Sequence, residues 1–437
     1  MTDLIREIAG PGDLRQLHRE YPERYPFLLQ STAPGGALGR YDILFAFPGD
    51  VLVAGDEPSF LDALDERWQQ ARNDDQEGDL PFKGGWFLYL GYELAAEVET
   101  GLSLAKDTVL PAAFAVRCPV ALIYDHEKAV CHLVCETPGC VDREQLRADI
   151  ETLERGRPVT PAKVLSVTEE EAPTFKDAVV RAKEHIAEGD VYQVNLSRQW
   201  SAKVSPGVDA SDIYLALCKS NPGPFAGMAR WQDMEIISSS PERLLQVSDG
   251  IASTRPIAGT RPRSQDAGAD EDLSTELFAH PKERAEHVML IDLGRNDLGR
   301  VCEAGTVEVD ELMILESYAH VHHIVSNVKG RLRSDVTPGQ AIAAVFPGGT
   351  ITGCPKVRCM EIISKLEQGP RGAYTGSFGF LNRDGSLDLN ILIRTIVKDN
   401  DRVTFRAGSG IVADSDPTAE LEETRAKAEG MLRAISR

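Results

Sequence analysis

The sequence predicts an α+β fold in which strands and helices follow one another irregularly. The first 155 residues are rich in β-type runs, of which the clearest are 41–47, 51–54 and 120–124. Well-marked helices come later, between Thr174 and Gly189 and from 417 to 435. No regular βαβ rhythm is present, which argues against a doubly wound sheet.

The predicted elements carry their own boundary signals. Residues 155–161 have the composition of a linker, so we expect a strand-rich region over 1–160 and a second region over 165–437, interlocked in one globule. Thr174 is the predicted N-cap of the first helix and Gly189 its end. The buried stripe of that helix is predicted to contain Phe175, Val179, Ala182 and Ile186. Asp416 and Pro417 mark the start of the last helix.

Composition limits the classes of partner. Lys and Arg number 47 and Asp and Glu 68, so the formal net charge of the 437 residues is −21. This sign argues against nucleic acids and anionic membranes as partners. The eight cysteines lack zinc-site spacing, no signal peptide is recognisable, and the longest apolar stretch, 86–98, is too short to span a bilayer. We therefore expect a cytoplasmic protein.

Two Glu-x-x-Glu pairs, Glu283/Glu286 and Glu420/Glu423, stand at the starts of predicted helices. Carboxylates three residues apart share a helix face, so two such pairs brought together form an oxygen-lined site suited to Mg²⁺. The alternative is that each pair only complements its helix dipole. Residues 288–291 are apolar and predict a buried helix, and carboxylates that lead into a buried helix need a partner such as a metal.

Three glycine-rich segments are candidates for binding an anion. Residues 256–263 place Gly259 beside Thr260, and residues 348–356 lead into a helix without satisfying the phosphate-loop pattern. The backbone amides of Gly408 and Gly410 are suited to a carboxylate. The alternatives are an ordinary turn for the first segment and a β-bulge for the third.

Two further features involve basic side chains. His322 and His323 lie in a strand-like run, in which alternation puts the imidazoles on opposite faces and one of them inside. Arg394 lies in the apolar run 391–397, which we predict to be a strand. A guanidinium there needs a bidentate carboxylate, supplied by a ligand or by a structural Asp or Glu.

Together these segments resemble the chorismate-utilising enzymes: component I of anthranilate synthase, component I of aminodeoxychorismate synthase, and the isochorismate and salicylate synthases. The similarity covers residues 170–430 and is weaker near 28–31 and 91–93. Five motifs in order carry it: 240–243 (Ser-Pro-Glu-Arg), 256–260 (Pro-Ile-Ala-Gly-Thr), 283–297, 349–356 and 420–427. The resemblance implies a large antiparallel β-sandwich core flanked by helices, of the anthranilate synthase component I type.

The resemblance also implies roles for single residues. Glu286 and Glu423 look like direct Mg²⁺ ligands, supported through water by Glu283 and Glu420, in a site that holds the ring carboxylate of chorismate. Glu242 resembles the general acid that protonates the departing hydroxyl. The other implied residues either clamp the enolpyruvyl carboxylate (Arg394, Tyr374, Gly408, Gly410) or line the ring side (His323, Thr350, Thr260, Lys427).

Several positions bear on which reaction is catalysed. Gln193 stands where the isochorismate and salicylate synthases carry a water-activating lysine, which favours ammonia as nucleophile. Ala258 points to anthranilate synthase, because most aminodeoxychorismate synthases have a nucleophilic lysine there. The runs 192–196 and 347–353, the short N-terminal part and Gln30 resemble aminodeoxychorismate synthases instead.

We weigh these concordant positions above Ala258 and predict an aminodeoxychorismate synthase component I with Pro-Ile-Ala-Gly-Thr at 256–260. Such an enzyme makes the precursor of 4-aminobenzoate for folate synthesis. Without an amine at 258, its intermediate is expected to be non-covalent 2-amino-2-deoxyisochorismate. The alternatives are anthranilate synthase component I, in tryptophan synthesis, and a non-catalytic protein that binds a metal or an anion on the same scaffold.

Two partners follow from this reading. The chain has no Gly-x-Cys-x-Gly glutaminase element, so we expect a separate glutamine amidotransferase subunit to supply ammonia. The resemblance also implies an N-terminal pocket that binds tryptophan in relatives, although the loop 31–36 departs from their usual pattern. The residues of this pocket are Ser31, Arg40, Tyr41, Pro224 and Phe225.

Overall fold

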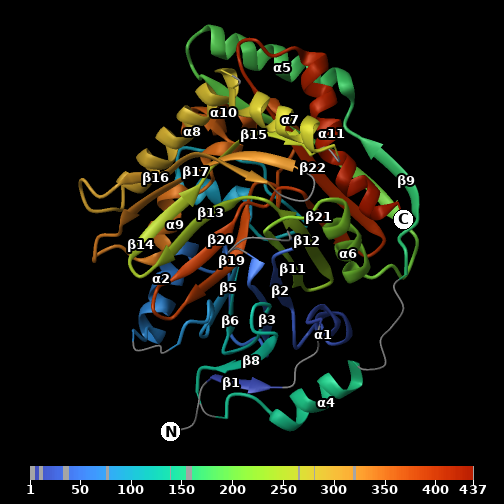
Figure 1. Cartoon of the computed structure of the whole chain (residues 1–437), viewed down its shortest axis with the longest axis vertical. Helices are drawn as coiled ribbons and strands as arrows, with labels where there is room; N and C mark the ends of the chain where they lie inside the picture. Colours follow the sequence, from blue (N-terminus) through green and yellow to red (C-terminus); the bar gives the residue numbers. More distant parts are fainter. Residues whose placement is uncertain are drawn as a thin grey trace.

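Two antiparallel β-sheets form the centre of the molecule, with helices around them (Figure 1). They are seen in a computed structural model that describes residues 5–8, 13–32, 39–74, 78–137, 139–153, 160–263, 266–279, 281–317 and 321–436. Most of the predicted linker, 155–159, lies outside the described residues. The mixed α+β fold predicted from the sequence is confirmed.

The first sheet has twelve strands in the described part of the chain, with β9 (Val164–Glu169) paired to β10 beside the main order. That order is β1 (Ile5–Ile8), β8 (Val130–Cys135), β7 (Val120–Asp125), β3 (Tyr41–Ala46), β2 (Phe27–Gln30), β11 (Phe225–Trp231), β12 (Met234–Ser240), β21 (Thr395–Asp399), β22 (Arg402–Ile411), β10 (Gln193–Val204) and β18 (Gly353–Cys354).

The second sheet has ten strands among the described residues, with β16 (Glu308–Ser317) paired to β17 beside the main order. That order is β15 (Ile257–Pro262), β17 (Val321–Arg331), β14 (Ile251–Arg255), β13 (Arg243–Ser248), β20 (Leu387–Asn390), β19 (Ser377–Asn382), β5 (Gly85–Leu90), β6 (Ala113–Cys118) and β4 (Val51–Val53).

The sheets pack face to face through aromatic side chains. Phe27 of the first sheet stacks on Phe87 of the second, with ring centroids 4.0 Å apart. Phe45 and Phe380 meet across the same gap at 6.4 Å. Each sheet contains strands from both the N-terminal and the C-terminal region, as in the pairings β2–β11 and β5–β19.

Helices cover the outer faces (Figure 1). Helices α7 and α8 pack on β15 and β17, and α5 and α11 pack on β10 and β22. The helices are α1 (Arg15–Glu20), α2 (Phe60–Ala71), η2 (Tyr92–Leu94), α3 (Ala95–Val98), α4 (Arg143–Leu153), α5 (Ala172–Ala187), α6 (Ala210–Ser220), α7 (Ala267–Ala279), α8 (Pro281–Gly299), α9 (Pro338–Val345), η3 (Gly349–Ile351), α10 (Lys356–Leu366) and α11 (Pro417–Ile435).

Helix boundaries agree with the sequence at one end of α5 and differ at the other. The helix begins at Ala172 rather than after Thr174, because Pro173 fits its first turn and Glu171 takes the N-cap position. Gly189, just past its end, has φ +81° as predicted for a glycine stop. Within the described residues, no helix is long and apolar enough to cross a membrane.

Candidate active site

Two helix starts bring the predicted glutamates to one place. α8 begins at Pro281 and α11 at Pro417, and proline suits the first turn because its missing N–H would be unpaired there. Asp416 caps α11 by accepting two backbone N–H groups at 2.9 Å. These helices carry the two predicted pairs, Glu283/Glu286 and Glu420/Glu423.

Glu286 lies where the charges of this site meet. Its Oε1 accepts a hydrogen bond of 2.8 Å from Nε2 of Gln193, at the start of β10. Burial raises the pKa of Glu286, the Gln193 bond opposes the rise, and the negative charges of Glu283 and Glu423 add to it. Helices far apart in the sequence therefore present carboxylates to the same space.

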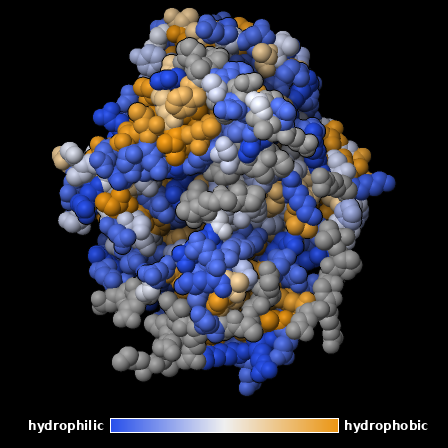
Figure 2. Space-filling view, in the orientation of Figure 1, coloured by the Kyte–Doolittle hydropathy of each residue, from blue (hydrophilic) through white to orange (hydrophobic). Residues whose placement is uncertain are grey.

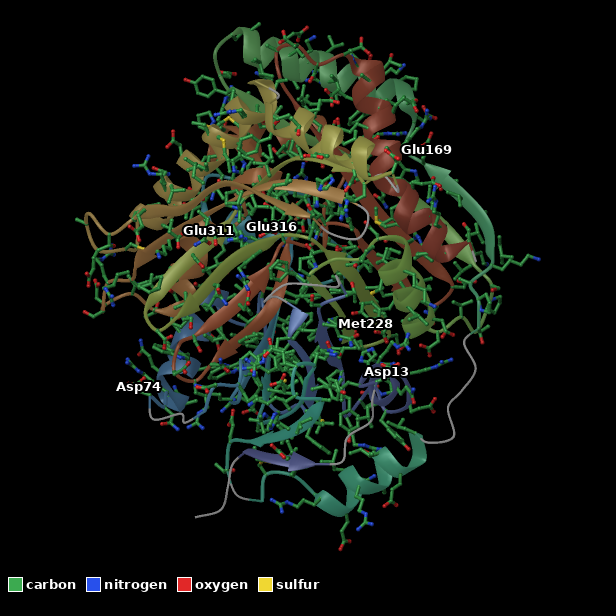
Figure 3. All side chains as sticks on the ribbon, in the orientation of Figure 1. Asp13, Asp74, Glu169, Met228, Glu311 and Glu316 are labelled. Atoms are coloured by element: carbon green, nitrogen blue, oxygen red, sulfur yellow. The ribbon has the colours of Figure 1, made fainter. Side chains whose placement is uncertain are left out.

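Lys427 offsets part of this negative charge. Its Nζ lies 2.7 Å from Oε1 of Glu423 and donates to the carbonyl oxygen of Gly408 at 3.0 Å. α11 is also tied to β9 by an ion pair between Arg425 and Glu169; Figure 3 labels Glu169 beside the helix. The start of α11 is thus fixed against both β22 and β9.

Glu420 provides a test of whether the site suits a cation. The residue is 8% exposed and its Oε2 is buried without a hydrogen-bond partner. Such an oxygen needs a positive partner, and a set of carboxylates is what Mg²⁺ prefers. The side chains of all four glutamates are described, and no three of them bring oxygens within 4.8 Å of one another. Glu286 is hydrogen-bonded to Gln193, and Glu423 is paired with Lys427. The donor chemistry fits a divalent cation.

The helix that follows Glu286 is buried on one side only. His287 and Ile291 are buried, and Nε2 of His287 lies 2.6 Å from Oγ of Ser326 on β17. The predicted burial of 288–291 is confirmed for Leu290 and Ile291 and is wrong for Val288, which is 49% exposed. The outer face of α8 instead contributes to apolar surface that Figure 2 shows where Figure 1 places α8 and α10.

Gly408 and Gly410 form a cradle on β22, facing β10. A methyl group at Gly408 would lie 2.6 Å from the hydroxyl oxygen of Tyr374 and 2.8 Å from Oδ1 of Asn195, and one at Gly410 would collide with Nε2 of Gln193. The Oδ1 atom of Asn195 is buried and has no hydrogen-bond partner. Since β22 pairs with β10 without a register shift, the alternative of a β-bulge here is wrong.

Glu242 lies between β12 and β13 and is 5% exposed. Burial raises the pKa of this carboxyl to about 7, while the Thr350 hydroxyl, the backbone of Ile257 and the charge of Arg394 act in the opposite direction. Oγ1 of Thr350 is buried and has no partner in hydrogen-bonding geometry. With a pKa of about 7 this carboxyl is about half protonated at neutral pH, which suits a general acid.

Arg394 does not lie in a strand, contrary to the prediction for 391–397. It occupies a bend before β21 with φ +52°, and β21 begins at Thr395. The side chain is enclosed by protein but keeps some accessible surface. Burial lowers the pKa of Arg394 to about 10, and the Glu242 charge opposes this. Within the described residues no carboxylate comes within 4 Å of its guanidinium, so a structural partner is not seen.

Both imidazoles of the His-His step are buried, so the prediction that only one lies inside is wrong. His322 lies against Asp270 of α7 at 3.1 Å and against Ser317 at 2.8 Å, because α7 covers the outer face of the sheet. His323 points the other way. Burial and the charge of Arg394 lower the pKa of His323 to about 4, which keeps it neutral.

Residues 257–260 lie in β15 rather than in a turn, and Pro256 immediately precedes the strand. The β15–β17 register shifts between Ala258 and Thr260, and Gly259, with φ +69°, is the bulged residue. A methyl group at Gly259 would lie 2.9 Å from Oε2 of Glu283, so the bulge adjoins the first glutamate pair. Ala258 is buried, and the Thr260 side chain lies outside the described residues.

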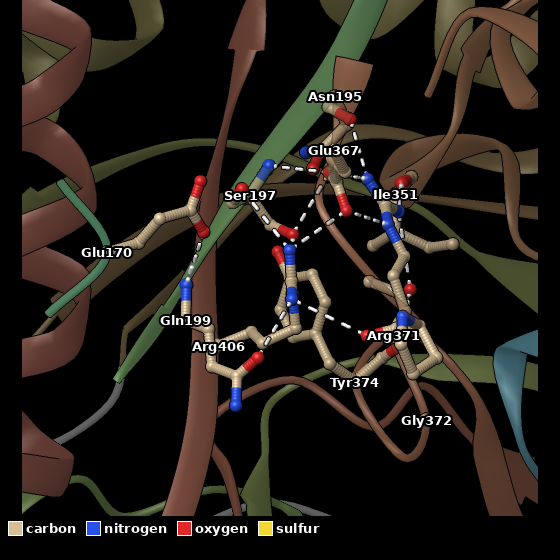
Figure 4. Close-up of polar contacts among 12 residues, drawn as sticks. Glu170, Asn195, Ser197, Gln199, Ile351, Glu367, Arg371, Gly372, Tyr374 and Arg406 are labelled. Carbon is tan, nitrogen blue, oxygen red and sulfur yellow. Dashed lines mark hydrogen bonds and ion pairs between the residues drawn. The ribbon is translucent and has the colours of Figure 1, made fainter. Parts of the chain in front are cut away.

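A buried ion-pair network supports the cradle and was not predicted (Figure 4). Glu367 binds Arg371 at 2.5 Å and Arg406 at 3.1 Å, and accepts the backbone N–H of Ser197 at 2.7 Å. Arg371 also donates to the carbonyl oxygen of Asn195 at 2.8 Å. Glu367 and Arg371 flank the Gln-Gly-Pro segment 368–370, where charged residues are ordinary, so the sequence carries no signal for this network.

The five residues of the predicted tryptophan pocket do line one cavity, of about 340 Å³. Arg40 pairs with Asp125 at 2.9 Å beneath this cavity, and Oγ of Ser31 is buried without a hydrogen-bond partner. The lining residues from the prediction are Ser31, Arg40, Tyr41, Pro224 and Phe225.

Comparison with known proteins identifies the family to which this chain belongs. A sequence profile described as chorismate binding enzyme matches residues 25–433. The chain belongs to the chorismate-binding enzyme family. Anthranilate synthase component 1 of Streptomyces coelicolor is 39% identical over 98% of this chain and 90% of that protein. Aminodeoxychorismate synthase component 1 of Bacillus subtilis is also 39% identical, over 97% of this chain and 94% of that protein.

A solved family member shares the fold. Anthranilate synthase component I from Streptococcus pneumoniae matches with a TM-score of 0.79 and 32% identity, over 91% of this chain and 93% of that one. The predicted resemblance and fold type are therefore confirmed. The chain is a chorismate-utilising enzyme of the anthranilate and aminodeoxychorismate synthase component I type, and relatives of both kinds match it equally well.

Proposed function

We propose that this family member is aminodeoxychorismate synthase component I, which converts chorismate and ammonia to 4-amino-4-deoxychorismate and water. The side chain of Asn195 is the observation that favours this product over anthranilate. Its buried Oδ1 lies beside the Gly408 cradle without a partner, and can accept an N–H of an aminated ring. The valine that anthranilate synthases tend to have at this place cannot.

The cradle and two side chains would hold the enolpyruvyl carboxylate. The guanidinium of Arg394 feels the charge of Glu242 but makes no ion pair within 4 Å with a carboxylate of the described residues, so it can bind a ligand carboxylate. The backbone N–H groups of Gly408 and Gly410 add donors. Burial raises the pKa of Tyr374 to about 12, so its hydroxyl stays a donor at neutral pH.

Glu286 and Glu423 would bind Mg²⁺, supported by Glu283 and Glu420. When bound, the ion would neutralise the ring carboxylate and act as a Lewis acid while the C4 oxygen leaves. Lys427, which pairs with Glu423 in this structure, would balance the negative charge of the ring carboxylate. Thr350, Thr260 and neutral His323 complete the ring side.

Glu242 would supply the proton for the departing hydroxyl. Ammonia forms a bond at C2 and gives up a proton, both ring double bonds move by one position, and the C4–O bond breaks to release water. A second ammonia then bonds at C4 and gives up a proton, both double bonds move back, and the C2 amine takes up a proton and leaves as ammonia. Ala258 offers no nucleophile, so the intermediate 2-amino-2-deoxyisochorismate would remain free of the protein; a substrate-sized adduct found by mass spectrometry during turnover would contradict this step.

Ammonia would come from a separate glutamine amidotransferase subunit, with ammonium salts replacing it in vitro. The decisive experiment is product identification from chorismate, Mg²⁺ and ammonium. Aminodeoxychorismate is detected only after a lyase converts it to 4-aminobenzoate, whereas anthranilate fluoresces directly. Ala258 favours anthranilate as the second candidate, and direct fluorescence without lyase would establish it instead.

A further inference from the structure

Glu93, in the N-terminal region, holds a turn that belongs to the C-terminal region. Its carboxylate accepts the backbone N–H of Arg371 at 2.8 Å and that of Gly372 at 3.1 Å. In return the N–H of Tyr92 donates to the carbonyl oxygen of Gly372 at 2.9 Å, and the Arg371 guanidinium lies 4.8 Å from the Tyr92 ring centroid. Helix η2 therefore binds both the backbone N–H groups and a carbonyl oxygen of the Arg371–Gly372 turn.

The Arg371–Gly372 turn contacts the residues that surround the Gly408–Gly410 cradle. Arg371 binds Glu367 and donates to the carbonyl oxygen of Asn195, on the β10 side. Tyr374 follows after one turn and places its hydroxyl against Gly408, on the β22 side. A displacement of the turn would therefore move both walls of the cradle.

A carboxylate is the side chain that this position requires. The Arg371 N–H bonds to Oε1, and the Gly372 N–H is shared between Oε1 at 3.2 Å and Oε2 at 3.1 Å. A carboxamide would replace one of these acceptor oxygens with an NH₂ donor. Glu93 is kept in place at some cost, because burial, with a smaller effect of Asp107, raises the pKa of Glu93 to about 7. Tyr89 and Tyr92 are the other titratable groups that face it.

We propose that Glu93 is a positioning residue for the substrate clamp, fixing Tyr374 and the Asn195 edge of β10 through the Arg371–Gly372 turn. This inference rests on the proposed function, in which the cradle holds the substrate. Glu97 gives a matched control. Its carboxylate also accepts two backbone N–H groups, those of Phe60 and Leu61 at 2.9 Å, but it only caps α2.

The test compares Glu93→Gln with Glu97→Gln by chorismate consumption in Mg²⁺ and ammonium. Glu93→Gln is expected to raise KM for chorismate about tenfold with a smaller change in kcat, because a misplaced clamp weakens binding. Glu97→Gln is expected to lower the Tm but leave KM unchanged. Glu93→Asp, which keeps both oxygens, should recover part of the lost affinity.

Equal KM values for Glu93→Gln and Glu97→Gln would overturn the proposal. Chorismate consumption is the same readout whether the product is aminodeoxychorismate or anthranilate, so an error in the product assignment does not affect the comparison. If the wild-type protein consumed no chorismate, the proposed function would fall. Glu93 would then be judged by calorimetric binding of chorismate, where equal affinities of wild type and Glu93→Gln would refute its role.

Discussion

The side-chain amide of Gln193 donates a 2.8 Å hydrogen bond to Glu286, which joins the first residue of β10 to the buried carboxylate of α8. The bond fixes one oxygen of Glu286 and leaves the other for a ligand. Gln193 is thereby engaged as a donor, and as an uncharged amide it cannot act as a base toward water.

Gln193→Leu is expected to weaken Mg²⁺ binding about tenfold, because a metal ligand that loses its supporting hydrogen bond is less well oriented. Mg²⁺ affinity can be measured by calorimetry. Gln145→Leu is the control, since Gln145 makes a similar 2.9 Å bond to Asp149 in α4. Unchanged Mg²⁺ affinity in Gln193→Leu would contradict the prediction.

Glu420→Gln is expected to abolish stabilisation of the protein by Mg²⁺ and to raise its Tm in EDTA, because the substitution removes a buried, unpaired negative charge. Thermal unfolding with and without the ion measures both effects. Glu429→Gln on the same helix removes an exposed carboxylate paired with Arg433 and should change neither. A Mg²⁺-dependent Tm shift that survives in Glu420→Gln would argue against this metal site.

Glu242→Gln is expected to lower kcat by about 10²–10⁴ while the fold is retained. Wild-type kcat should fall as pH rises above about 7, because the carboxyl, whose pKa is near 7, then loses the proton that it must donate. The variant should lack this limb of the pH profile. A matching pH profile in both proteins would assign the proton to another group.

The same carboxyl should make stability depend on pH. Since the folded-state pKa of Glu242 is raised, its contribution is fully present below its unfolded pKa, near 4.5, and is lost as pH rises through 7. The free energy of unfolding of Glu242→Gln, compared with that of wild type, should therefore rise by about 3 kcal/mol as the pH goes from 4 to 8. Denaturant unfolding at the two pH values tests this, and a constant difference would show that the carboxyl is not buried as described.

Asn195→Val is expected to raise the ratio of anthranilate to aminodeoxychorismate, because it removes the acceptor beside the cradle. Fluorescence before and after lyase treatment measures the two products. Asn327→Val removes an exposed amide bonded to Asp310 and should leave the ratio unchanged. An unaltered ratio in Asn195→Val would remove the structural argument for the product.

The sequence predicted those features, such as helix ends, that are determined by residues close together in the chain. Gly189 and Asp416 mark helix ends because a left-handed stop and an N-cap are decided by the chain beside them. The approach of Glu286 to Glu423 followed only from the resemblance, since spacing along a helix does not say which helices meet.

The errors come from contacts made at long range. Arg394 follows apolar residues that are typical of a strand, yet the chain bends there with φ +52° and the side chain is only partly buried. His322 is buried because α7 lies over it, which strand alternation does not reveal. Glu367 and Arg371 are close in sequence, but their third partner, Arg406, lies on β22.

The pairing of β5 with β19 has a consequence for synthesis of the chain. β5 is buried along its whole length, and its neighbour β19 emerges from the ribosome about 290 residues later, which at typical elongation rates takes tens of seconds. During that interval the apolar edge Trp86–Leu90 has no native neighbour on that side. The nascent N-terminal region is therefore expected to depend on chaperones until translation is nearly complete.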